Sequence, residues 1–159
     1  MGKKGLTLVE LLAVVAIIGI LSIMITPGII SIRNNVLEST YRTRVSQIEN
    51  AAKEYATDHI NLIPSNIPDS AVLSENDLKN ETYRSSCPTD YSATISVNYL
   101  ISSGYISGTN SYTTSDGQVK ENQIINPKTG ETMNNMVVCM RFSSRDAMKR
   151  ELLAYLLEE

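Results

Sequence analysis

The sequence predicts an α+β protein: a long N-terminal helix, transmembrane in its first half and amphipathic in its second, packed on a small antiparallel sheet of three or four strands. A helix is also expected at the C-terminus. Three observations predict this fold. An apolar block spans 6–25, helical periodicity continues from it to about residue 58, and two strand-like segments follow with a turn at 126–130 between them. One apolar block joined to one polar body excludes a polytopic membrane protein, a collagen and a multidomain enzyme.

The apolar block has polar side chains only at Thr7, Glu10 and Ser22. A helix needs about 20 apolar residues to cross roughly 30 Å of hydrocarbon, and this block is long enough. Lys3 and Lys4 precede it, so the positive-inside rule leaves the N-terminus in the cytoplasm and sends the body across the membrane. The alternative is a cleavable secretory signal, but the apolar region of such a signal has about 7–15 residues and ends at a small-x-small site. No convincing site of that kind ends this block.

Glu10 is a carboxylate inside the apolar block, where an acidic group costs about 2.5–3.5 kcal/mol on insertion scales. It therefore requires a cationic partner. If the chain were cut after Gly5, the new amino group of Leu6 would lie one helical turn from Glu10. That amine could neutralise Glu10 of its own chain or, better, of a neighbouring chain. A buried charge neutralised only by another subunit would set the register of a helical assembly.

The N-terminal segment resembles the class III signal of type IV pilins and the related pseudopilins over the letters GLTLVELLAVVAIIGILSIMITP. The matches are the basic leader, Gly5 before the cut, Glu10 as fifth residue of the mature chain, and Gly19 and Pro27 at the family's helix-loosening positions. The family usually has Phe first in the mature chain. This sequence has Leu6, so its methylated product would be N-methyl-leucine. The resemblance covers about the first 30 residues.

The resemblance implies three parts of the chain: a prepilin leader at 1–5, a transmembrane and filament-core helix at 6–28, and a globular pilin headgroup at 29–159 that includes the second half of the long helix. A prepilin peptidase would cut the leader and methylate the new amine. The subunit would wait as a single-pass protein in the cytoplasmic membrane. An inner-membrane assembly platform and its ATPase would then extract it into an extracellular pilus of sister subunits and other pilins.

Beyond Pro27, apolar residues recur mostly at steps of three or four, the spacing of an amphipathic helix. They are Ile29, Ile32, Val36, Tyr41, Val45, Ile48, Ala52 and Tyr55. Pro64 and Pro68 prevent continuation, so the long helix is expected from about residue 6 to about residue 58. Gly19 and Pro27 would let this helix bend or stretch; the alternative for Pro27 is a simple end to the membrane helix.

The rest of the body is rich in loops, with strands expected at 118–125 and 136–142. Residues 102–118 consist mostly of Ser, Thr, Gly, Asn and Asp, which favours a hairpin or an exposed loop and makes this segment our candidate for the outward surface. Residues 96–100 fit either a strand or a short helix, and a further short helix is expected around 76–79.

Ser143 or Ser144 can cap a last helix from Arg145 to about Leu157. Such a tail is not a usual pilin ending. The helix would cover one face of the sheet or contact another subunit or partner, and an added, non-native extension is the third interpretation.

Cys87 and Cys139 are the only cysteines. Their separation excludes a CxxC redox motif, and two thiols cannot complete a zinc site. An exported body makes a disulfide between them the expected state, with two buried free thiols as the alternative. The chain-entropy model values such a bond at about 4 kcal/mol. The resemblance supports the disulfide, because many pilins bound their variable surface in this way.

Charge and motifs argue against catalysis and against nucleic-acid binding. Without Lys3, Lys4 and Glu10 the chain has 12 basic and 16 acidic residues, a net charge of −4 that gives no general affinity for phosphate backbones. The single histidine, His59, is expected to be a solvated residue at the end of the long helix. Phosphate-loop, dinucleotide, serine-hydrolase and zinc-protease motifs are absent from the sequence. We expect no enzyme, no cofactor and no metal.

The sequence therefore predicts a structural subunit, a major or minor pilin of a type IV pilus that serves adhesion, twitching motility or DNA uptake. A pseudopilin of a type II secretion or competence apparatus is one alternative. A signal-anchored surface binding domain that never polymerises is the other.

Overall fold

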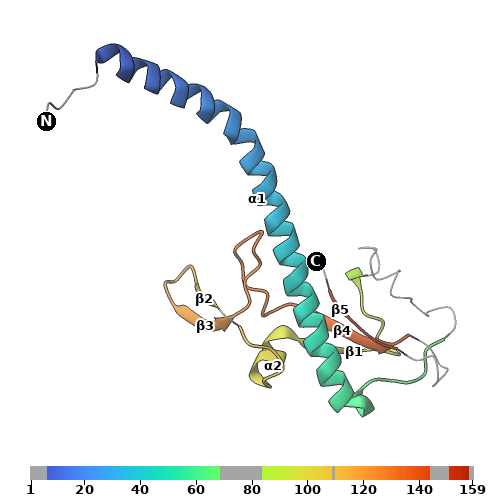
Figure 1. The fold of residues 1–159 in the computed structure, drawn as a ribbon. Coiled ribbons are helices and arrows are strands. Elements are labelled where there is room, and N and C mark those ends of the chain that lie inside the picture. The colour runs from blue at the N-terminus through green and yellow to red at the C-terminus, as the bar shows by residue number, and fades with distance from the viewer. Residues whose placement is uncertain (1–6, 69–83, 109, 144–150, 158–159) are drawn as a thin grey trace, which may run out of the picture. The chain divides into compact units, whose positions relative to one another are not determined.

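The computed structural model describes most of the chain, in four stretches. They are residues 7–68, 84–108, 110–143 and 151–157 (Figure 1). For residues 21–30 and for Tyr112 only the backbone is described. The chain divides into two compact units, residues 1–39 and residues 40–159, which we describe separately.

One α-helix, α1 (Leu8–Asp58), runs through both units and confirms the predicted long helix. It continues without interruption through Pro27, so the interpretation of that residue as the end of the helix is wrong. A proline removes one backbone donor, and a long helix can continue past that loss at a local cost. After Asp58 the chain tightens into the 3₁₀ turn η1 (Ile60–Leu62), ahead of Pro64.

In the first unit, the described apolar side chains of α1 lie exposed from Leu8 to Ile20. Within the described part of the chain, no helix is found that has the length and apolar character needed to span a membrane. The predicted span at 6–28 lies partly outside the described residues, since residue 6 and the side chains of 21–28 are not included.

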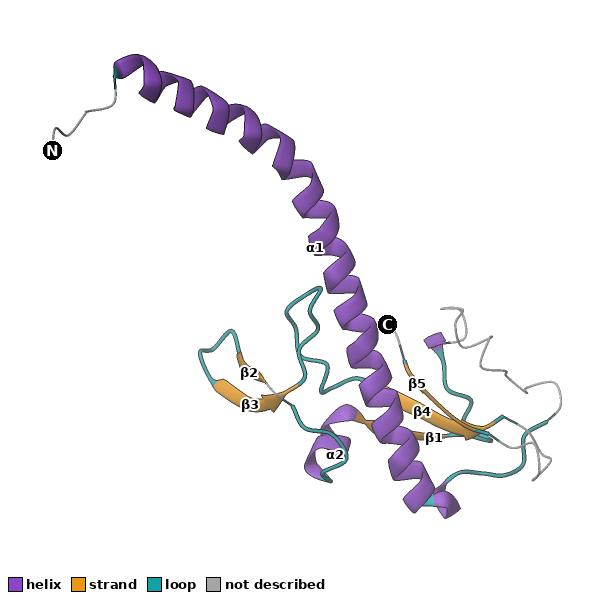
Figure 2. Ribbon diagram, viewed as in Figure 1, coloured by secondary structure: helices purple, strands orange, loops and turns teal. Residues whose placement is uncertain are grey.

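In the second unit, the described residues hold a three-stranded antiparallel sheet in the order β1–β4–β5. The strands are β1 (Ala93–Ser96), β4 (Val137–Phe142) and β5 (Leu152–Leu156). Figure 2 shows this sheet beside the C-terminal part of α1. Ile48 and Ala52 of α1, both fully buried, belong to the same apolar core as Val138 of β4 and Leu156 of β5. Val45, Ile48, Ala52 and Tyr55, which belong to the predicted amphipathic pattern, thus form the helix side of the core.

A separate hairpin is formed by β2 (Asn110–Thr113) and β3 (Val119–Gln123), which confirms the hairpin expected from the polar composition of 102–118. The strand expected at 136–142 is β4. The turn at 126–130 is also confirmed, because the N–H of Gly130 donates to the carbonyl of Asn126 at 2.8 Å.

The ambiguous segment at 96–100 is the start of a short helix, α2 (Val97–Ser102). Ser96 ends β1 and caps this helix, because its hydroxyl accepts a hydrogen bond from the N–H of Tyr99 at 3.2 Å. The short helix expected around 76–79 lies outside the described residues.

The C-terminal helix predicted from Arg145 to Leu157 is wrong where the chain is described, because Leu152–Leu156 form β5; residues 144–150 lie outside the description. Burial explains the difference. Ala154 and Leu156 pack in the core against α1, whereas Leu153 and Tyr155 pack in a second cluster with Cys139 on the other face. A helix buries one stripe, whereas a strand covered on both faces buries every residue.

Candidate functional site

The first turn of α1 is closed by a reciprocal pair of side chains, Thr7 and Glu10. The N–H and the hydroxyl of Thr7 both donate to Oε2 of Glu10 at 2.9 Å, and the N–H of Glu10 donates to the Thr7 hydroxyl at 3.3 Å. This is a capping box, which satisfies two N-terminal donors that the helix itself leaves unpaired. Gly5 and Leu6, the predicted cut site, lie outside the described residues, so the pairing of Glu10 with the Leu6 amine stays a prediction.

The helix surface from Leu8 to Ile20, which includes Glu10, is otherwise apolar on all sides. Its exposed large side chains keep 49–78% of their accessible area, and they are Leu8, Val9, Leu11, Leu12, Val14, Val15, Ile17, Ile18 and Ile20. A continuous apolar surface of this kind on a helix indicates contact with lipid or with other proteins. A Cβ placed on Gly19 would meet no atom within 4 Å, so nothing in its described surroundings requires a glycine there. Its predicted assembly role and that of Pro27 are untested.

The second unit contains the disulfide that the sequence predicts. Cys87 and Cys139 are bonded, with their Cα atoms 5.6 Å apart. Cys139 is fully buried in the middle of β4, and Leu153 and Tyr155 pack with it. The phenol of Tyr155 donates to the carbonyl of Ser86 at 3.1 Å, so β5 holds the Cys87 segment through a second contact.

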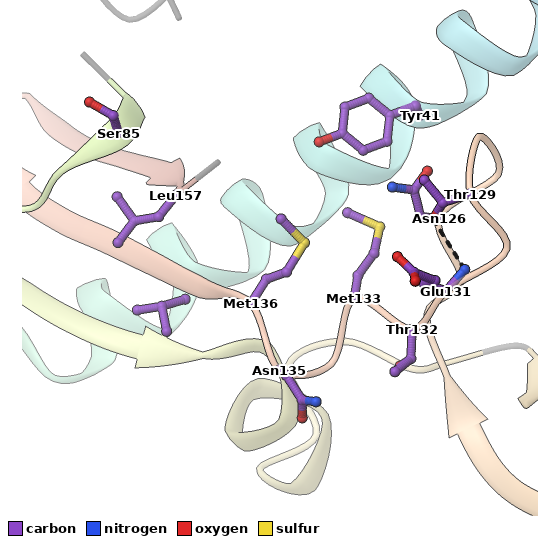
Figure 3. Close-up of a pocket in the computed structure, with 11 residues that line it drawn as sticks. Tyr41, Ser85, Asn126, Thr129, Glu131, Thr132, Met133, Asn135, Met136 and Leu157 are labelled. Atoms are coloured by element: carbon purple, nitrogen blue, oxygen red, sulfur yellow. Dashed lines mark hydrogen bonds between the residues drawn. The ribbon is translucent and has the colours of Figure 1, made fainter. Parts of the chain in front are cut away.

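A cavity of about 650 Å³ lies in the same unit, between α1, the 126–132 turn and the ends of β4 and β5. Its described lining residues are Tyr41, Ser85, Asn126, Thr129, Glu131, Thr132, Met133, Asn135, Met136, Val137 and Leu157. In Figure 3 the side chains of Met133 and Met136 point toward α1, beside Tyr41. The cavity therefore joins an apolar interior to a rim of amides, hydroxyls and one carboxylate.

An aromatic cluster surrounds the C-terminal end of α1. His59 stacks on Tyr55 with ring centroids 4.3 Å apart, and Tyr99 and Tyr105 meet Tyr55 edge-on. The phenol of Tyr105 donates to the Asp58 carboxylate at 2.8 Å, which together with burial raises the pKa of Tyr105. His59 is exposed, as expected for a residue at the helix end.

Metal chemistry has no evident centre in the described residues, because no group of three or more His, Cys, Asp or Glu side chains gathers there. Hydrogen bonds of polar side chains in the second unit stabilise the fold. The clearest case is buried Asn134, whose Oδ1 accepts from the N–H of Ile124 at 3.0 Å and whose carbonyl accepts from the N–H of Asn98 at 2.8 Å. Asn134 thereby ties the segment after β3 to the start of α2.

A family model matches the N-terminal segment described above. Residues 1–26 match the prokaryotic N-terminal methylation motif. The chain carries a prepilin-type signal. This is the class III signal of type IV pilins and pseudopilins, and the matched residues include Gly5, Leu6, Glu10 and Gly19. Neither the curated proteins nor the solved structures include a match to the chain.

Two features of the chain were not predicted from its sequence. Thr7 was treated only as an interruption of the apolar block, although T-x-x-E before an apolar run is the signature of a capping box. The cavity carries no sequence signal, because its lining comes from separate segments between Tyr41 and Leu157 that only the fold brings together.

Proposed function

We propose that this chain is a structural subunit, major or minor, of a type IV pilus, cut by a prepilin peptidase after Gly5 and polymerised through its N-terminal helix. The methylation motif at residues 1–26 is the observation that carries this proposal. It lies on α1, whose exposed apolar surface from Leu8 to Ile20 requires a covering. A cytoplasmic membrane covers that surface before assembly, and sister helices cover it in the filament.

Polymerisation lets the apolar surface of residues 8–20 leave the membrane without entering water. Lipid tails and apolar side chains are about equally apolar, so a helix can move from membrane to a bundle of sister helices with little hydrophobic cost. Transfer into water would be strongly unfavourable. Extraction from the membrane is therefore feasible when other subunits replace lipid around residues 8–20.

Glu10 would give this bundle its register. Its carboxylate lies at the start of α1, and the capping box with Thr7 holds it there. After cleavage the methylated amine of Leu6 would neutralise Glu10, best in a neighbouring subunit. A subunit placed out of register would leave the carboxylate unpaired in an apolar bundle, which is costly.

Processing is tested first, on protein taken from its source cells. Mass spectrometry of the N-terminal peptide should find a chain that begins at Leu6 and carries one extra methyl group. An intact Met1, or a cut beyond Ile25, would indicate a plain anchor or a secreted domain and would contradict the proposal.

Assembly is tested with Glu10→Gln, which keeps the shape of the side chain and removes its charge. The variant should enter the membrane and be processed, yet yield few or no sheared fibres. Glu54→Gln is the matched control, since Glu54 is exposed on α1 within the second unit; its fibre yield should equal that of the wild type. A normal fibre yield from Glu10→Gln would refute the register role of the charge.

Fractionation separates the proposed pilus from the alternative assignments. Abundant sheared extracellular fibres support a pilus subunit, whereas short, scarce filaments would favour a pseudopilin. Retention of all the protein in washed membranes would favour the non-polymerising anchor.

Adhesion is tested by shortening the β2–β3 hairpin tip at 114–117. Loss of attachment with intact fibres would make this tip the outward surface.

A further inference from the structure

The cavity of Figure 3 has an apolar interior and one acidic residue at its rim. Met133, Met136 and Leu157 supply apolar side chains, and Glu131 is the only charged residue among the described lining residues. Glu131 is exposed, so its carboxylate lies at the cavity's open rim. Its volume of about 650 Å³ lies within the range of about 300–1,000 Å³ that is usual for ligand pockets.

One basic residue, Lys128, contacts the lining residue Tyr41. The ammonium of Lys128 lies over the ring of Tyr41, 4.9 Å from its centroid. This cation–π contact places the Lys128 ammonium beside Tyr41, one of the residues that line the cavity. Glu131 supplies the one carboxylate among the described lining residues, and a basic group on an incoming segment would complement it.

A segment of matching character lies on α1 in the other unit. Ile32 and Val36 are four residues apart, so they lie on one face of the helix, and their side chains are 65% and 56% exposed. The exposed Arg33 lies next to Ile32. The neighbouring Asn34 and Asn35 are polar and exposed, so Ile32 and Val36 form an exposed apolar pair with polar residues between them.

We propose that the cavity of Figure 3 in one subunit receives Ile32 and Val36 of a second copy of this chain. Arg33 of that copy would then lie beside Glu131. The inference rests on the proposed function, because only in a filament does α1 of one subunit meet the second unit of another. Two complementarities support it: an exposed apolar pair meets an apolar interior, and a basic residue meets the one acidic residue of the rim. The docked segment excludes water from both surfaces.

Cross-linking in sheared fibres tests the docking. Two differently tagged copies are co-expressed, one with Ile32→Cys and the other with Asn135→Cys, an exposed lining position of the cavity. The native cysteines are bonded and do not react with a short bis-maleimide. We expect a mixed-tag dimer. The matched control replaces Asn135→Cys by Val119→Cys, a 63% exposed position on the hairpin, and should give several-fold less dimer.

Two outcomes would overturn the docking. They are fibres in normal amount without the dimer, and equal dimer yields from the cavity and hairpin positions. Absence of fibres from the wild-type chain would overturn the proposed function together with the docking. The two failures are therefore distinguishable.

Charge reversal provides a second, independent measurement. Glu131→Arg and Arg33→Glu should each lower the fibre yield several-fold, and the double variant should restore much of it. Glu121→Arg, a reversal at an exposed position of β3, is the control and should leave the yield unchanged. Two damaging single reversals without rescue in the double variant would refute the pairing of Arg33 with Glu131.

Discussion

Glu49 of α1 holds the last strand of the sheet by accepting a hydrogen bond from the backbone N–H of Leu156, at 3.1 Å from its Oε1. Arg84 donates to the same oxygen from 2.7 Å. The outer N–H groups of an edge strand have no ladder partner, so a side-chain acceptor is valuable there. One half-buried carboxylate therefore connects α1, β5 and the segment that leads to Cys87.

Replacement of this carboxylate should destabilise the second unit, residues 40–159, which we call the head. We expect Glu49→Ala to lower the free energy of unfolding by about 1.5–3 kcal/mol, the usual worth of hydrogen bonds to a charged group. Thermal unfolding of the full chain in detergent, followed by circular dichroism, measures the loss. Glu54→Ala, further along α1 at an exposed position, should change stability by no more than about 0.5 kcal/mol. Equal losses in the two variants would contradict the bridging role of Glu49.

Gly108 is required by a close approach of two backbone segments. A Cβ at this position would lie 2.2 Å from the carbonyl carbon of Asn122 and 2.5 Å from the nitrogen of Gln123. The N–H of Gly108 also donates to Oδ1 of Asn122 at 2.8 Å, and Asn122 has a left-handed φ of 58°. The base of the β2–β3 hairpin thus has no room for a methyl group.

We expect Gly108→Ala to cost about 1–3 kcal/mol, the range for an overpacked site, and to loosen the hairpin. Amide hydrogen exchange should accelerate in β2 and β3, while β4 keeps its protection. Ser107→Ala, the exposed neighbour, is the control and should leave exchange unchanged. Protected hairpin amides in the Gly108→Ala variant would show that the two backbones can separate at little cost.

The disulfide should contribute a large share of the stability of the head. The Cys87–Cys139 bond closes a loop with a sequence separation of 52 residues, worth about 4 kcal/mol in the chain-entropy model. We expect reductant to lower the melting temperature of the wild type, and Cys87→Ala with Cys139→Ala to melt at that lower temperature in either condition. A melting temperature unchanged by verified reduction would contradict this contribution.

Local patterns predicted most of the fold. The spacing of Ile48 and Ala52 predicted a helix because a single face of α1 packs on the sheet, and the Asn126–Gly130 turn followed from turn-forming residues. The C-terminal strand was misassigned because Leu153–Leu156 are all apolar. A run of this kind fits a helix face as well as a strand buried on two sides, and pairing with β4 decides between them.

One part of the candidate site could be predicted from the sequence, and another part could not. The residues around Glu10 that we propose for processing and assembly lie in one contiguous motif, so the sequence alone could suggest them. The cavity beside Tyr41 could not be predicted, since its walls come from segments that are more than a hundred residues apart at the extremes. Its apolar lining at Met133 and Met136 has no spacing that separates a cavity wall from ordinary core.

Thr7 should matter through the geometry of the first turn. Its hydroxyl accepts from the N–H of Glu10 and donates to the carboxylate, so Thr7→Ala removes both contacts. Loss of an N-cap side chain costs about 0.5–2 kcal/mol. We expect faster amide exchange at Glu10 in Thr7→Ala and near-wild-type exchange in Thr7→Ser, which retains a hydroxyl. Unchanged exchange in Thr7→Ala would mean that the box does not hold the turn in solution.

Tyr155 should make the head sensitive to alkaline pH. Burial raises the pKa of its phenol, because a phenolate there would lose hydration; the nearby charge of Arg141 opposes this shift and is the smaller effect. The unfolded chain releases the proton near pH 10, whereas the folded chain retains it to higher pH. Stability is therefore fully present below about pH 10 and falls as the pH rises through that value toward the folded pKa.

The measurement compares unfolding free energies of the wild type and Tyr155→Phe from about pH 8 to about pH 11. At the lower pH the variant should be weaker by about 0.5–1.5 kcal/mol, since it lacks the hydrogen bond to the Ser86 carbonyl. Above about pH 10 its stability should fall less steeply than that of the wild type. Some decline should persist, because the pKa values of Tyr55 and Tyr105 are raised as well. Parallel pH profiles for the two proteins would show that ionisation of Tyr155 does not limit stability, whatever the offset at neutral pH.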